Sequence, residues 1–219
     1  MIKKLKELIA PVNESQSSEN SKSGKDKMVL LDPALLQALA PPEPDLRVVG
    51  LFTDVHEEKV AELVHGFLHL DEMNQLSEET HQQPIKFYIS TYGGNADDMF
   101  ALYDVIRQVK GTSEVHTIGL GKVMSAGVLL LASGTKGKRQ IGKNCRVMIH
   151  SVMGGNHGSL HNMMNELEAI EQLQDMYCDA LISETKLTRA RLKKMIERKV
   201  NVYLSAEEAV ELGIADIII

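Results

Sequence analysis

The chain has 219 residues, of which 43% are hydrophobic, and this size and composition allow one sizeable core. Its net charge is −6, it has no tryptophan and only 4% of its residues are aromatic. It therefore lacks the positive surface and the stacking groups expected of a nucleic-acid-binding protein. Its two cysteines have no metal-type spacing and are too few for a disulfide framework, which favours a reducing, cytoplasmic compartment.

The first 45 residues differ in composition from the rest of the chain. Residues 13–27 are rich in serine, asparagine, lysine and glutamate, and such a segment cannot bury enough apolar surface to offset the entropy lost on ordering. No apolar run here is long enough for a secretion signal or a membrane span. We therefore predict a flexible N-terminal extension over residues 1–45, one domain over residues 46–219, and no membrane partner.

Short apolar runs alternate with longer helical patterns along the rest of the chain. Strands are predicted at residues 46–53, 86–91, 115–120, 146–151 and 201–204. Helices are predicted at residues 57–75, 97–109, 125–133, 159–183, 189–198 and 206–212. This alternation predicts an α/β fold with right-handed crossovers.

Ser125 stands between the predicted strand 115–120 and an apolar helix, with small residues close by. A serine on a strand-to-helix turn exposes its Oγ, and the first N–H groups of the helix are free to bind a developing oxyanion. This context predicts a nucleophile. A helix N-cap is the alternative, because serine is a preferred cap.

His150 lies at the end of the predicted strand 146–151, where functional side chains collect, and a double glycine follows it. A lone histidine at such a place is more often structural than catalytic. Another double glycine, Gly93 and Gly94, follows the strand 86–91 and lets the backbone come close to a ligand. Together with the serine, these features indicate a serine hydrolase.

Five ordered blocks of the chain resemble the proteolytic subunit of the Clp protease, ClpP. These blocks are residues 89–94, 121–131, 137–139, 146–150 with 154–155, and 204–216. The resemblance covers residues 45–219 and implies a ClpP/crotonase-like fold, with a repeated β-β-α/βαβ core and a protruding long handle helix. It implies Ser125 as nucleophile, His150 as general base, and the N–H groups of Gly94 and Ala126 as the oxyanion hole.

The chain departs from the family pattern at two places near this site. Asn201 occupies the position where the family has the third triad member, an aspartate. An aspartate orients the imidazole and stabilises the imidazolium, whereas an asparagine can only accept the hydrogen bond and brings no charge. We expect a slow enzyme, or one that needs assembly to align its triad. Tyr92 replaces the proline before the double glycine, so the loop is less rigid and bulk is added beside the substrate channel.

Residues 159–183 form a methionine-rich amphipathic pattern of about seven turns, too long for a small domain to cover. Its apolar positions are Leu160, Met163, Met164, Leu167, Ile170, Leu173, Met176, Tyr177 and Leu181. The helix either packs wholly on its own sheet or forms an interface. The resemblance implies the second, a handle joining two stacked rings of a homo-oligomer.

Other polar clusters are interpreted as surface. Residues 136–139 form a basic stretch that could bind an anion, but a turn with solvated cations explains it, and residues 189–194 are the exposed side of a short helix. Cys145 is a weak candidate for a thiol nucleophile because it lacks a helix-start context. His65 and His69 have i, i+4 spacing but no third ligand, so we predict no metal and no cofactor.

The leading prediction is a subunit of an ATP-dependent Clp-type protease, a serine endopeptidase that hydrolyses unfolded polypeptides inside an oligomeric ring chamber. The chain has no nucleotide motif, so a separate AAA+ ATPase unfoldase is the expected partner. The alternatives are a noncatalytic or weakly active ring subunit, a phage-type capsid-maturation protease, and a crotonase-like acyl-thioester enzyme. The chemistry of a crotonase-like enzyme needs no nucleophile at this place, so the presence of Ser125 and His150 argues against that alternative.

Overall fold

The computed structural model describes residues 46–77, 83–155, 157–197 and 201–219, so the predicted N-terminal extension lies outside the described residues. The elements in chain order are β1 (Val48–Leu51), α3 (Glu57–Leu76), β2 (Ile85–Thr91), α4 (Ala96–Val109), β3 (Val115–Met124), α5 (Ala126–Ala132), β4 (Gln140–Ile141), β5 (Arg146–Ile149), α6 (Leu160–Glu184), α7 (Arg189–Glu197), β6 (Val202–Leu204), α8 (Ala206–Glu211) and β7 (Ile217–Ile218). The predicted strands and helices from residue 46 onward are all present, and the α/β class is confirmed. Strands β4 and β7 are absent from the prediction because two residues carry no alternating pattern.

The strands form one mostly parallel sheet in the order β1-β2-β3-β4-β7, and a branch leaves it at β3. The first half of β3 pairs with β4, whereas its last residues, Lys122 to Met124, pair in parallel with β5. Strand β6 then pairs antiparallel with β5. In parallel strands the carboxyl ends meet at one edge. Because Met124 is in register with Met148, Ser125 and His150 both follow strand ends at that edge.

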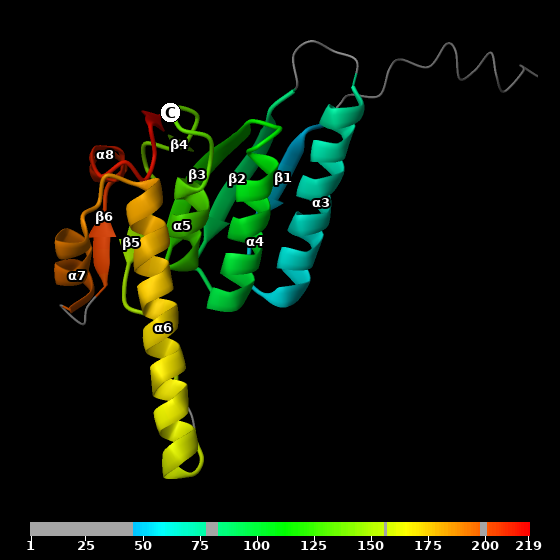
Figure 1. Ribbon diagram of the computed structural model, residues 1–219. Helices are drawn as coiled ribbons and strands as arrows, with labels where there is room; N and C mark the ends of the chain where they lie inside the picture. Colours follow the sequence, from blue (N-terminus) through cyan, green and yellow to red (C-terminus); the bar gives the residue numbers. More distant parts are fainter. Residues whose placement is uncertain (1–45, 78–82, 156, 198–200) are drawn as a thin grey trace, which may run out of the picture. The chain divides into compact units, whose positions relative to one another are not determined.

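Helices α3, α4 and α5 lie side by side against the strands β1, β2 and β3, and this layer holds the core (Figure 1). Strand β2 shows why, since Ile85, Phe87 and Ile89 are buried at alternate positions while Lys86 is exposed. All seven residues of α5 are buried. The helix that begins next to Ser125 is therefore a fixed part of the core.

Helix α6 packs only at its C-terminal end. Of its 25 residues, which span about 37 Å, those that are buried are Tyr177, Cys178, Leu181 and Glu184. Its N-terminal part projects away from the other elements (Figure 1). Large apolar side chains are exposed there, namely Leu160, Met163, Met164 and Leu167. The predicted protruding helix is confirmed. None of the described helices is long and apolar enough to cross a membrane.

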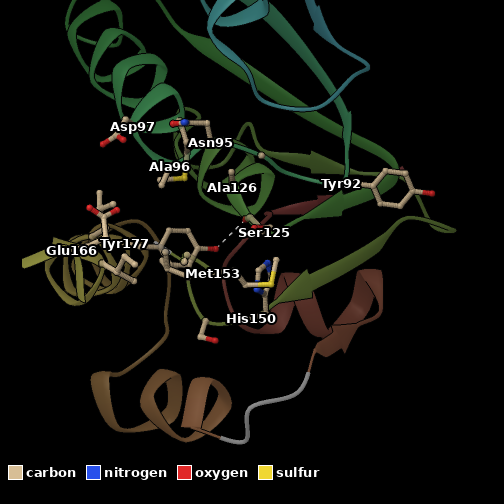
Figure 2. Close-up of a pocket in the computed structure, with 18 residues that line it drawn as sticks. Tyr92, Asn95, Ala96, Asp97, Ser125, Ala126, His150, Met153, Glu166 and Tyr177 are labelled. Carbon is tan, nitrogen blue, oxygen red and sulfur yellow. Dashed lines mark hydrogen bonds between the residues drawn. The ribbon is translucent and has the colours of Figure 1, made fainter. Parts of the chain in front are cut away.

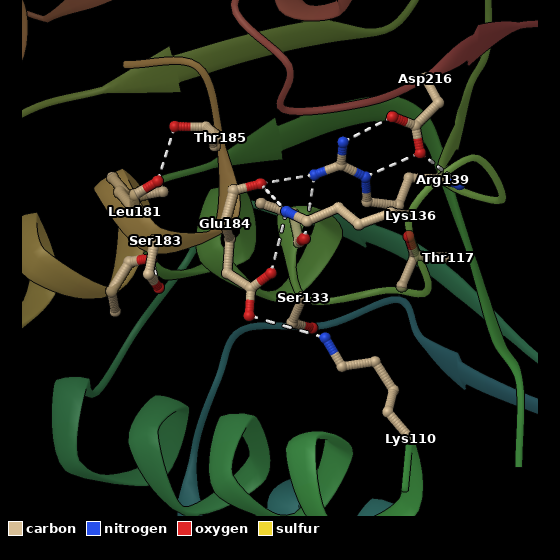
Figure 3. A network of polar contacts seen from close by, with 12 residues as sticks. Lys110, Thr117, Ser133, Lys136, Arg139, Leu181, Ser183, Glu184, Thr185 and Asp216 are labelled. Atoms are coloured by element: carbon tan, nitrogen blue, oxygen red, sulfur yellow. Dashed lines mark hydrogen bonds and ion pairs between the residues drawn. The ribbon is translucent and has the colours of Figure 1, made fainter. Parts of the chain in front are cut away.

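The interpretation of residues 136–139 as a turn with solvated cations is wrong for Arg139, which is 3% exposed. The chain does turn there, at Gly137 with φ 82°, but Arg139 reaches inward and pairs with Asp216 (Figure 3). It also donates to the carbonyls of Ala132 and Glu184, the last residues of α5 and α6, which have no partner within their helices. Its main partner is 77 residues away in sequence, so the local pattern carried no sign of it.

Candidate active site

Ser125 is the one residue between the end of β3 and the start of α5, and its backbone is strained. It has φ 54° and ψ −122°, and of the residues the structure describes it is the only non-glycine with a positive φ. Such a conformation costs about 1–3 kcal/mol and persists where the surroundings enforce it. Here the Ser125 N–H donates to the Met148 carbonyl at 2.8 Å, and the Tyr177 hydroxyl donates to the Ser125 carbonyl at 3.0 Å. The serine side chain makes no cap hydrogen bond, so it does not act as the N-cap alternative requires.

The double glycine after β2 lies directly against this serine. A Cβ atom added to Gly93 would lie 2.5 Å from the Cβ of Ser125, so a side chain there would clash. Gly93 also has φ 105°, a backbone conformation that other residues rarely adopt. The loop is held by the buried Thr91, whose Oγ1 accepts from the Gly93 N–H at 3.0 Å, and by Val55, whose N–H donates to the Gly93 carbonyl at 2.7 Å. The backbone after β2 is thus fixed beside the serine.

The N–H groups of Gly94 and Ala126 are placed to serve as hydrogen-bond donors. The bridge between Val55 and this loop uses the Gly93 carbonyl and the Asn95 N–H, which leaves the Gly94 N–H outside it. Ala126 is the first residue of α5, so its N–H has no partner within the helix. Both residues line the same cavity as Ser125. Their role as oxyanion donors stays a prediction that this placement supports.

Two cavities meet at His150. The first, of about 440 Å³, is lined by Ser125 and His150 and extends between α4 and α6. The second, of about 670 Å³, is lined by His150 and Asn201. Because His150 borders both cavities, it lies between the serine side and the asparagine side, which is the order that a serine, histidine and asparagine triad needs.

His150 shares one cavity with Ser125 and the other with Asn201, but these three described side chains are not joined by hydrogen bonds. In Figure 2 the His150 ring lies close to Ser125, yet within the described part of the chain no hydrogen bond joins His150 to Ser125 or to Asn201. Catalytic hydrogen bonds in unliganded enzymes are often long and tighten when substrate binds. The arrangement therefore supplies the groups for acyl transfer without their final alignment.

The second cavity carries positive charge. Lys122 lies over the Tyr92 ring at 4.6 Å, and Arg146 lies over the Tyr203 ring at 4.7 Å. Tyr92 borders both cavities and is 64% exposed, and its place beside the substrate stays a prediction. These cation–π pairs make the wall on the Asn201 side aromatic and basic.

Sequence reasoning placed Ile170, Leu173 and Tyr177 in an interface stripe, whereas all three line the cavity of Ser125. Helix α6 thus carries an apolar stripe that is exposed along its N-terminal turns and faces the cavity along its later turns. Burial raises the pKa of Tyr177, so its hydroxyl remains a donor to the Ser125 carbonyl. Gln174, on the same helix, accepts the Val152 N–H at 2.7 Å and so holds the loop after His150. The repeated spacing of three and four was visible in the sequence, but which turns of the helix face the cavity was not.

Cys145 is a poor alternative nucleophile. It is 2% exposed, and burial raises its pKa to about 11, so the thiol stays protonated near neutral pH. It does not line either of the two cavities beside His150. Of Cys145 and Ser125, the serine is therefore the better candidate nucleophile.

Comparison with known proteins agrees with this chemistry. A family model described as Clp protease matches residues 45–219. The ATP-dependent Clp protease proteolytic subunit 3 of Synechococcus sp. (strain CC9902) is 35% identical over 174 residues, which cover 79% of this chain and 82% of the relative. The ATP-dependent Clp protease proteolytic subunit of Deinococcus radiodurans is 32% identical over 173 residues, covering 79% and 80%. Subunit 3 of Synechococcus sp. (strain CC9605) is 34% identical, with coverage of 79% and 82%.

Proposed function

This chain belongs to the Clp protease family as a ClpP-type protease subunit, and we propose that it is an active serine endopeptidase that hydrolyses unfolded polypeptides through Ser125 and His150. The observation that carries the proposal is the backbone of Ser125. A strained serine between a strand and a buried helix, with its Oγ free of any cap bond and a histidine in the same cavity, has the features of an activated nucleophile.

In this mechanism His150 accepts the proton of the Ser125 hydroxyl while Oγ attacks the scissile carbonyl. The N–H groups of Gly94 and Ala126 stabilise the oxyanion that forms. His150 then gives its proton to the leaving amine. Water, activated by the same histidine, hydrolyses the acyl-enzyme and restores the serine.

An asparagine at position 201 offers the imidazole a hydrogen-bond acceptor when the site is aligned, but it leaves the imidazolium without a charged partner. In trypsin, the same change from aspartate to asparagine lowers the rate about 10⁴-fold. The second candidate is therefore a ring subunit with little or no activity of its own. It is favoured by Asn201 and by the missing hydrogen bonds around His150, and disfavoured by the backbone geometry of Ser125.

The exposed apolar face of α6 supports assembly into stacked rings of identical subunits. An apolar face of this kind, with Leu160, Met163 and Leu167 exposed, marks an interaction surface. The domain over residues 46–219 forms the ring, and its partner is a separate AAA+ ATPase unfoldase, in line with "ATP-dependent" in the names of the relatives. We place this assembly in the cytoplasm, with no cofactor.

The test is degradation of an unfolded polypeptide by the assembled protein. We expect cleavage by the wild type, loss of cleavage in Ser125→Ala, and an oligomeric mass by light scattering for both. A wild type that forms rings but leaves the polypeptide intact would favour the noncatalytic subunit.

Assembly is tested by Met163→Glu combined with Leu167→Lys, since both side chains belong to the exposed face. We expect smaller species and less cleavage. Substitutions of Ile170 or Leu173 would disturb the cavity as well as the helix, so they do not separate assembly from catalysis. An unchanged mass in the double variant would contradict the interface.

A further inference from the structure

The cavity beside Ser125 has one wall made by α6. The residues of this wall are Glu166, Ile170, Leu173 and Tyr177, spaced by four, three and four, so they share one face of the helix. Tyr177 and Leu173 lie toward the serine end of this face, and Glu166 lies farthest from it along the helix. The wall is therefore apolar near the nucleophile and acidic at its outer end.

The facing wall comes from the start of α4. Met99 is a buried apolar residue of this lining, Ala96 has only a small side chain, and Asp97 is exposed. Figure 2 shows the carboxylates of Asp97 and Glu166 on opposite sides of the opening between the two helices. No lysine or arginine is among the described residues that line this cavity.

Glu166 is exposed, and its carboxylate is available to a ligand. It lies in the second turn of α6, so it does not stabilise a helix end, and among the residues that the structure describes no hydrogen bond or ion pair engages its carboxylate. Asp97 differs, because it lies in the first turn of α4, where a negative charge stabilises the helix N-terminus. Glu166 is thus the more informative of the two acids.

The two cavities that meet at His150 have opposite charges. The one on the Ser125 side has Asp97 and Glu166, and the one on the Asn201 side has Lys122 and Arg146. A cationic side chain is attracted to the first and repelled by the second. The N–H groups of Gly94 and Ala126 line only the first cavity, so in the proposed mechanism the scissile carbonyl, and with it the residue on the acyl side, is bound at this cavity.

We propose that this cavity selects polypeptides with a lysine or arginine within the first residues on the acyl side of the cleaved bond, and that Glu166 is the residue that determines this specificity. The apolar walls contact the methylene stem, and the carboxylates of Glu166 and Asp97 receive the cationic end. The inference rests on the proposed function and adds the substrate class to it.

The test scans one lysine over the three positions before the cleaved bond in a fluorogenic peptide, with norleucine as the matched apolar residue. We expect lysine at one of these positions to raise kcat/KM about fivefold over norleucine, the size of effect that an exposed ion pair supplies. Glu166→Gln should remove this gain. Glu168→Gln, an exposed acid of the same helix that does not line the cavity, should keep it.

A second pair of variants controls for the end of α4. Asp97→Asn should reduce the gain, while Asp98→Asn, in the same first turn but outside the cavity lining, should not. Equal hydrolysis of lysine and norleucine peptides, or a gain that survives in Glu166→Gln, would overturn the specificity and leave the peptidase standing. A wild type that hydrolyses none of the peptides would overturn both.

Discussion

The buried charges around Arg139 and the polar groups around Ser125 are organised in opposite ways. The Arg139 side chain is 4% exposed, binds both carboxylate oxygens of Asp216 at 2.5 and 2.8 Å, and donates to two helix ends. At the active site, no hydrogen bond within the described chain joins Ser125, His150 and Asn201. The charges around Arg139 are thus fully paired within the described chain, whereas Ser125, His150 and Asn201 are not joined to one another.

The fixed region anchors only one end of α6. Glu184, its last residue, contacts Lys136 at 3.0 Å and Lys110 at 3.6 Å (Figure 3). It also accepts a hydrogen bond from the Tyr103 hydroxyl at 3.1 Å. Burial lowers the pKa of Lys110, and the attraction of Glu184 opposes this shift. The other end of α6 projects freely and carries the exposed apolar face. Contacts made by that face can reach the active site through Gln174 and Tyr177 on the same helix.

The largest effect is expected at Ser125. Ser125→Ala should lower peptidase activity by about 10³-fold or more, because the nucleophile is lost. Ser125→Gly should be equally inactive, yet it should unfold at a higher temperature than Ser125→Ala by a few degrees, since glycine adopts a positive φ at little cost. Thermal unfolding of the two variants measures the strain. Equal unfolding temperatures for the two variants would mean that the backbone at Ser125 is not strained.

The second prediction concerns a variant that removes the buried ion pair between Arg139 and Asp216. Arg139→Met leaves Asp216 without its partner and should lower the free energy of unfolding by about 3–5 kcal/mol, the usual cost of breaking a buried pair. Arg107→Met is the control, because the Arg107 and Asp104 side chains are 60% and 73% exposed, and it should cost less than about 1 kcal/mol. Urea unfolding compares them. Similar losses of unfolding free energy in both variants would contradict the claim that the Arg139 pair is the more strongly stabilising one.

A third prediction sharpens the active-site side of the comparison. Asn201→Asp should raise kcat about tenfold, which corresponds to about 1.4 kcal/mol, because a carboxylate stabilises the imidazolium in the transition state. Gln108→Glu adds the same charge at an exposed place on α4 and should leave kcat unchanged. A rate that does not rise in Asn201→Asp would mean that this residue does not partner His150.

The smallest effect concerns pH. Burial raises the pKa of Asp216, but the hydrogen bonds and the charge of Arg139 outweigh it, so its pKa lies below the ordinary value. The carboxylate therefore contributes stability that is present above about pH 4, the unfolded value, and is lost as the pH falls through the folded pKa. Urea midpoints between pH 5 and pH 2 should fall more steeply for the wild type than for Asp216→Asn. Parallel curves would contradict the ion pair.

These two regions also differ in how far the sequence could predict them. Ser125 and His150 follow strand ends that are visible as apolar runs, so their shared edge could be inferred, and the structure brings them to one cavity. Arg139 was misjudged because Asp216, its partner, lies far along the chain, and a basic turn looks the same whether it is solvated or paired. Periodicity found α6 but could not say which turns point to the site and which to solvent.

The central claim is that Ser125 is an activated nucleophile, and labelling with a fluorophosphonate tests it most directly. The account predicts one adduct by intact mass, mapped to Ser125, absent in Ser125→Ala and formed faster in Asn201→Asp. An adduct on another residue, or labelling that is unchanged in Ser125→Ala, would contradict the claim.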